Sequence, residues 1–119
     1  MRGFESLRRA LPLVLASVLW AAALPALEVP YLAGRVNDLA GLLDATVEQQ
    51  IEAKLEQLEK ETGAQVAVLT LASLEDEPVE DFALRVVETW KLGREGIDDG
   101  ALLLISRDDR KIRIEVGYG

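Results

Sequence analysis

The sequence contains no cysteine and no histidine. Without cysteine the chain can form no disulfide, thiolate nucleophile or thiolate metal site, and it cannot receive a bacterial lipid on cysteine. Without histidine it lacks the most common general base and the usual ligand of catalytic zinc. Any chemistry must therefore rest on carboxylates, lysine, arginine, tyrosine, hydroxyl groups or a hard metal ion.

Basic residues are scarce as well. The sequence has 13 Lys and Arg residues and 21 Asp and Glu residues, which gives a formal net charge of −8. The first 26 residues hold three arginines and one glutamate, a net +2, so residues 27–119 carry −10. This charge argues against nucleic acid and against an anionic membrane surface as partner. The 119 residues suffice for one domain, and the 50% hydrophobic content predicts a globular one.

Residues 1–26 have the pattern of an export signal. Three arginines precede an uncharged apolar run over residues 10–23, and small residues offer a cut after Ala23 or after Ala26. The run is short for a membrane span, which favours a cleaved signal over the alternative of an uncleaved anchor. Either way we expect the rest of the chain in the periplasm or on the extracytoplasmic face of a membrane.

Two amphipathic helices alternate with apolar strands along residues 44–116. The first helix is predicted between an N-cap at Asp44 and a left-handed glycine at Gly63, and the second begins just after Pro78. Their apolar stripes are Val47, Ile51, Leu55 and Leu58, then Val79, Phe82, Ala83, Val86, Val87 and Trp90.

Residues 65–71 and 101–105 form nearly continuous apolar runs, which is typical of buried strands. A strand, helix, strand order predicts parallel neighbours. Asp108 and Asp109 then form a tight turn into an alternating strand over residues 111–116, which has one wet face. The pattern predicts a small mixed α/β sheet with helices packed on it. Since the sequence stops at residues 117–119 with no closing helix, we expect one sheet face to lack its cover.

Asp98 and Asp99 are the strongest candidate site residues, because adjacent carboxylates in a glycine-broken loop are hard ligands for a divalent cation. Asp38 is a remote third carboxylate. If the three converge, Ca²⁺ or Mg²⁺ would relieve their mutual repulsion. The alternative is that Asp98-Asp99-Gly100 is a solvated turn and that Asp38 caps local backbone. Serine and threonine default to structural hydroxyls, since a Ser-His-Asp triad is impossible here.

Five ordered stretches together resemble the TPM domain family. They are Val36–Leu43 (Val-Asn-Asp-Leu-Ala-Gly-Leu-Leu), Thr62–Val68, Trp90–Gly93, Asp98–Leu104 and Asp109–Gly119. The family loop usually reads Asp-Asn-Gly, whereas Asp98-Asp99-Gly100 places a second aspartate there. The match spans residues 29–119, so we expect residues 27–119 to form a TPM domain whose C-terminal part is missing.

The resemblance implies an exported three-layer α/β/α domain, commonly tethered by a later transmembrane helix. Its relatives include thylakoid-lumen proteins of photosystem II repair, and calcium binding and acid-phosphatase activity have been attributed to members. The resemblance also implies an acidic cleft, which Asp38, Asp98 and Asp99 would form at the matching positions of this sequence. We expect a cation-binding module that acts on envelope or membrane proteins. The alternatives are a metal-assisted phosphatase and a structural adaptor without a metal.

Overall fold

The computed structural model describes residues 26–94 and 99–117. The predicted signal segment therefore lies almost entirely outside the described residues, as does Asp98. The elements are β1 (Val36–Asp38), α3 (Ala45–Thr62), β2 (Gln65–Leu71), α4 (Val79–Trp90), β3 (Gly100–Ser106) and β4 (Lys111–Gly117). Among these residues no helix is long and apolar enough to cross a membrane.

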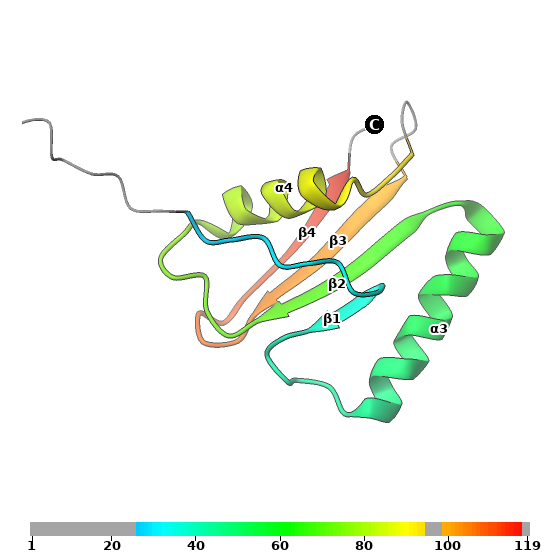
Figure 1. Ribbon diagram of the computed structural model, residues 1–119, viewed down its shortest axis with the longest axis horizontal. Helices are drawn as coiled ribbons and strands as arrows, with labels where there is room; N and C mark the ends of the chain where they lie inside the picture. The colour runs from blue at the N-terminus through cyan, green and yellow to red at the C-terminus, as the bar shows by residue number, and fades with distance from the viewer. Residues whose placement is uncertain (1–25, 95–98, 118–119) are drawn as a thin grey trace, which may run out of the picture.

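The four strands form one mixed sheet in the order β1-β2-β3-β4. The first three strands run parallel, and β4 returns antiparallel to β3 after a turn over residues 107–110 (Figure 1). This arrangement confirms the small mixed sheet that the alternation of helices and strands predicted. It also fixes where each loop lies, because β1, β2 and β3 all end at the same edge of the sheet.

One face of the sheet carries the main hydrophobic core. The α4 stripe packs there against Ala67, Leu69, Leu102 and Leu104, and Phe82, Leu69, Leu102 and Leu104 are completely inaccessible to solvent. The segment before β1 contributes Leu27, Val29 and Leu32 to the same core. A hydrogen bond of 2.9 Å from the Trp90 indole to the carbonyl of Pro30 fastens this segment to α4.

The other face is covered more thinly. Since side chains alternate along a strand, Val36 and Val68 point away from the α4 core, yet both are buried. Helix α3 contacts β1 and β2 and provides this cover, which gives the three layers. The predicted N-cap at Asp44 and left-handed Gly63 are confirmed, but no residue of α3 is fully buried.

The two faces of strand β4 differ in exposure, and the more exposed face carries the apolar side chains. Alternation predicted one wet face without saying which one, and in the structure Ile112 and Ile114 are each 69% exposed and Val116 is 43% exposed. The Glu115 side chain, on the α4 side, is only 13% exposed. We call Ile112, Ile114 and Val116 the open face, because no described element covers them.

Candidate functional site

Asp38, the last residue of β1, uses its carboxylate to hold the loop that leads into α3. It accepts hydrogen bonds from the amides of Leu42 (2.9 Å) and Leu43 (2.8 Å) and from the hydroxyl of Thr70 (2.6 Å). Burial opposes ionisation, but these hydrogen bonds outweigh it and hold the pKa of Asp38 below its ordinary value. The structure thus gives Asp38 the capping role that was the alternative to metal binding.

A second carboxylate holds the neighbouring loop at the same edge of the sheet. Asp109 accepts from the Ser106 hydroxyl at 2.6 Å and from the amide of Leu74 at 2.7 Å. The hydrogen bond from Ser106, followed by the one from Leu74, lowers the pKa of Asp109. Sequence reasoning assigned Asp109 to the β3–β4 turn, which is correct, but missed that its side chain reaches the loop after β2.

Arg107 ties the β3–β4 turn, to which it belongs, to the loop that leads into α3. Its Nη1 donates to the carbonyl of Ala40 at 2.9 Å, and its Nε donates to Asp108 at 2.9 Å. Thr70 and Ser106 are each only 1% exposed, and their hydroxyls donate hydrogen bonds to carboxylates of the protein itself. At the carboxyl edge of the parallel strands, where ligands of open α/β sheets usually bind, these hydroxyls and carboxylates are therefore engaged in internal hydrogen bonds.

Asp99 lies at the opposite edge, immediately before β3. Its carboxylate accepts from the Nε of Arg94 at 2.9 Å and from the amide of Arg94 at 3.1 Å. The hydrogen bond from the Arg94 side chain, followed by the one from its amide, lowers the pKa of Asp99. Gln65 fastens the ends of this loop to β2. Its backbone amide donates to the Asp99 carbonyl, and its side-chain Oε1 accepts from the backbone amide of Gly93.

The structure does not bring Asp38 and Asp99 together. Asp38 is level with Thr70, whereas Asp99 precedes Gly100, which is level with Gln65. Thr70 and Gln65 are five positions apart along β2, which corresponds to about 16 Å at roughly 3.3 Å per residue. Asp38 and Asp99 therefore do not share one site, and the third predicted ligand, Asp98, lies outside the described residues. Within residues 26–94 and 99–117, no three acidic side chains gather as a metal site.

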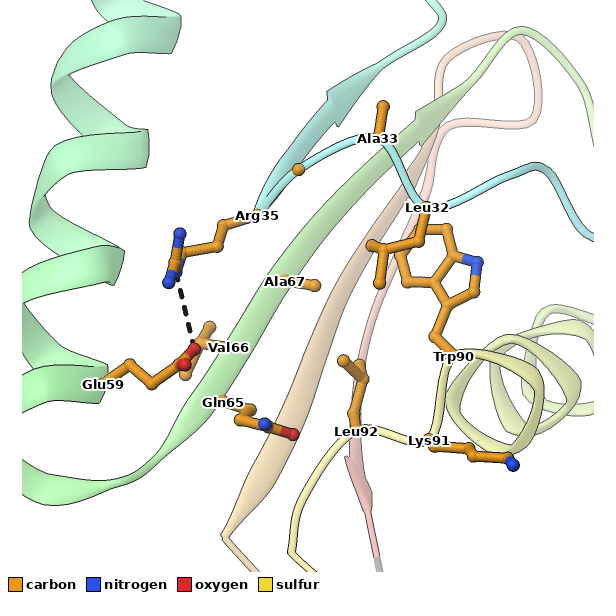
Figure 2. Close-up of a pocket in the computed structure, with 11 residues that line it drawn as sticks. Leu32, Ala33, Arg35, Glu59, Gln65, Val66, Ala67, Trp90, Lys91 and Leu92 are labelled. Carbon is orange, nitrogen blue, oxygen red and sulfur yellow. Dashed lines mark ion pairs between the residues drawn. The ribbon is translucent and has the colours of Figure 1, made fainter.

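A hollow lies between the ends of the two helices (Figure 2). Its volume is about 360 Å³. Leu32, Trp90 and Leu92 line its apolar side, and Arg35 lies at its rim with Nε 3.5 Å from Glu59. Arg35 also bonds Glu52 at 3.3 Å, so its charge is matched within the protein. This volume lies at the lower end of small-molecule pockets. Sequence reasoning did not find the hollow, since its lining comes from four separate segments.

In a comparison with protein families, the sequence model of the TPM domain family matches residues 36–119 of this chain. The chain belongs to the TPM domain family. The NMR structure of the N-terminal domain of a protein from P. gingivalis has 34% identity and a TM-score of 0.69 over 81% of this chain. No curated protein matches the chain.

The fold also occurs in the N-terminal domain of the cg2496 protein from Corynebacterium glutamicum, with 14% identity and a TM-score of 0.60 over 82% of this chain. This TPM domain spans 66% of the P. gingivalis chain and 62% of the C. glutamicum chain. The names of these two proteins state no activity.

Proposed function

We propose that this TPM domain is an exported, non-catalytic module that binds another envelope or membrane protein. The observation that carries the proposal is the open face, where Ile112 and Ile114 are each 69% exposed on a regular strand. Adjacent apolar side chains exposed on one sheet face are typical of an interaction surface. The engagement of Thr70 and Ser106 in internal hydrogen bonds supports a binding role over a hydrolytic one.

We propose further that a divalent cation, Ca²⁺ or Mg²⁺, binds at the Asp98–Asp99 loop without Asp38. Helix α3 ends at Thr62 and α4 ends at Trp90, so both helices direct the negative ends of their dipoles towards the edge where Asp99 lies. Arg94 lies there too, against Gly63 and bonded to Asp99. A cation would have to displace this guanidinium, so binding should be weak.

The experiment is a Ca²⁺ titration followed by amide chemical shifts. We expect saturable shifts at Asp99 and Gln65 at millimolar Ca²⁺ and none at Leu42 and Leu43, whose amides bond Asp38. Asp99→Asn should remove the response and Asp38→Asn should keep it, while Arg94→Gln should tighten binding severalfold by removing the competing charge. Shifts centred on Leu42 and Leu43, or no shifts at all, would overturn the cation site.

The alternative function is a metal-assisted acid phosphatase, and the position of Arg94 is the observation that favours it. A guanidinium bonded to Asp99 could hold a phosphate oxygen beside a carboxylate-bound cation. In that case turnover of an aryl phosphate requires the loop, and Asp98→Asn with Asp99→Asn abolishes it. Turnover that survives this double substitution rejects the phosphatase. A purely structural adaptor predicts that the double variant keeps wild-type stability, with or without Ca²⁺.

A further inference from the structure

The two outer strands of the sheet differ in how their edges are protected. At β1, the carboxylate of Glu52 accepts from the amides of Arg35 (3.1 Å) and Val36 (2.8 Å), so α3 occupies donors of a strand that is only three residues long. At β4, seven residues pair with β3 on one side, and no strand within the described part of the chain pairs on the other. An open edge of this length is a template for another strand.

The sequence of β4 is complementary to itself in one antiparallel register. If the strand pairs with a second copy so that the two Ile114 residues are opposite, Arg113 faces Glu115 of the copy and Glu115 faces its Arg113. Opposite charges placed directly across a strand pair stabilise it. Arg113 and Glu115 already form an ion pair of 2.9 Å within one strand, so pairing would extend it into an alternating row of four charges.

Neighbouring registers match the charges less well. A register centred on residue 113 keeps two opposite-charge pairs, Lys111 with Glu115 in each direction, but sets the two Arg113 side chains against each other. A register centred on residue 112 sets Lys111 against Arg113 twice. Like charges directly opposite each other destabilise a strand pair. Shifting the centre by one residue also exchanges which side chains lie across from one another, so the charge pattern selects the register.

The register centred on Ile114 also groups the apolar side chains. It places Ile112 beside Val116 of the copy and the two Ile114 side chains beside each other, all on the open face. Each of these residues is exposed in the single chain, and each would gain a β-branched neighbour at cross-strand distance. The charged and the apolar side chains of β4 therefore favour the same pairing.

We propose that this TPM domain forms a two-fold dimer by antiparallel pairing of β4 with β4 of a second copy, with the two Ile114 residues opposite each other. The dimer joins two four-stranded sheets into one. It pairs the edges of β4 and sets the two open faces side by side in one continuous sheet, without covering them. The two proposals can therefore fail separately, and a chain that stays monomeric could still bind an envelope protein through its open face.

Single cysteines test the register directly, because the chain has no native cysteine. In the proposed dimer the Cα atoms of the two residues 114 lie about 4.5–5.5 Å apart, within the range of about 4.4–6.8 Å that a disulfide spans. Ile114→Cys should therefore give a covalent dimer under mild oxidation. Ile112→Cys is the matched control, since Ile112 is equally exposed but would lie about 14 Å from its counterpart.

Charge substitutions test the same register without oxidation. Arg113→Glu should weaken dimerisation at least tenfold, measured by sedimentation equilibrium, and Arg113→Glu with Glu115→Arg should restore it to within about threefold. Lys60→Glu, an equal charge change on α3 far in sequence from β4, should have no effect. Circular dichroism of each variant shows that the fold is kept.

Three results would overturn the proposal. They are a wild-type protein that remains monomeric at a few hundred micromolar, a covalent dimer formed as fast by Ile112→Cys as by Ile114→Cys, and a charge exchange that fails to restore the affinity lost by Arg113→Glu. A fast-crosslinking Ile112→Cys would indicate packing of open faces instead of strand pairing.

Discussion

At the scale of single residues, the position of Asp38 decides how the candidate site is interpreted. A carboxylate that accepts three hydrogen bonds from its own loop and from Thr70 stabilises backbone that would otherwise lack partners. The same three donors favour the charged form. Asp38 is thus a structural residue whose contribution to stability depends on pH.

We predict that Asp38→Asn destabilises the domain by about 1–3 kcal/mol at pH 7, because an amide cannot accept from all three donors. The folded state lowers the pKa of Asp38. The stabilisation is therefore fully present above the unfolded-state pKa, about 3.9, and is lost as the pH falls through the lower folded-state value. Urea unfolding of both proteins between pH 7 and pH 2.5 should show their difference shrinking below about pH 4.

Asp76→Asn is the control for this prediction. Asp76 is exposed and makes no side-chain hydrogen bond within the described part of the chain, so its substitution removes the same charge without removing an acceptor. A constant difference between wild type and Asp38→Asn across the whole pH range would contradict the ionised, hydrogen-bonded carboxylate.

The sequence could reveal the capping role of Asp38 but not the partner that completes it. The pair Asn37-Asp38 lies between apolar residues, as a turn would, and the alternative that Asp38 caps local backbone was therefore visible. Thr70 is 32 positions away, and only the parallel register of β1 with β2 brings it level with Asp38. The separation of Asp38 from Asp99 depends on the same register, so spacing alone could not exclude a shared site.

At the scale of elements, the loop before β3 depends on a pair of glycines. Gly100 of β3 and Gly117 of β4 are register partners, and the backbone of Leu92 lies against both. A Cβ at Gly100 would approach the carbonyl carbon of Leu92 to 2.4 Å, and one at Gly117 would approach the Leu92 carbonyl oxygen equally closely. These glycines let the chain pass directly over the strands.

We predict that Gly100→Ala destabilises the domain by about 1–3 kcal/mol, because the clash is with backbone that cannot rotate away. Chemical denaturation measures the loss. Since the displaced backbone of Leu92 and Gly93 leads directly into Arg94, which bonds Asp99, amide shifts should spread through Gly93, Arg94 and Asp99. Gly34→Ala is the control, because a Cβ there would meet only the flexible end of Glu52 at 3.4 Å. Equal stability of both variants would contradict the close approach.

Helix and strand positions followed from local patterns, whereas the polarity of β4 did not. The caps of α3 and the start of α4 depend on a few neighbouring residues and were predictable. Alternation in β4 shows that its two faces differ, but it cannot tell which face another element covers. Helix α4 lies over the charged side and contacts β4 extensively, so the isoleucines are left exposed.

At the scale of the whole molecule, the division of charge matches the proposed export. Residues 1–26 carry a net +2 and residues 27–119 carry −10. The described domain begins to make contacts at Leu27, which packs on the core and whose carbonyl accepts from Arg85 at 2.8 Å. A cut after Ala23 or after Ala26 would leave every described contact in place.

We predict that the protein recovered from the extracytoplasmic fraction begins at Leu24 or at Leu27, which intact-mass measurement distinguishes. Leu15→Arg, which interrupts the apolar run over residues 10–23, should leave the chain in the cytoplasm with residues 1–26 still attached. The unfolding free energies of the cleaved and retained chains should agree within about 0.5 kcal/mol, because the contacts described for the domain involve Leu27 and later residues. A full-length chain in the membrane fraction would indicate an uncleaved anchor, and a full-length wild-type chain in the cytoplasm would reject export.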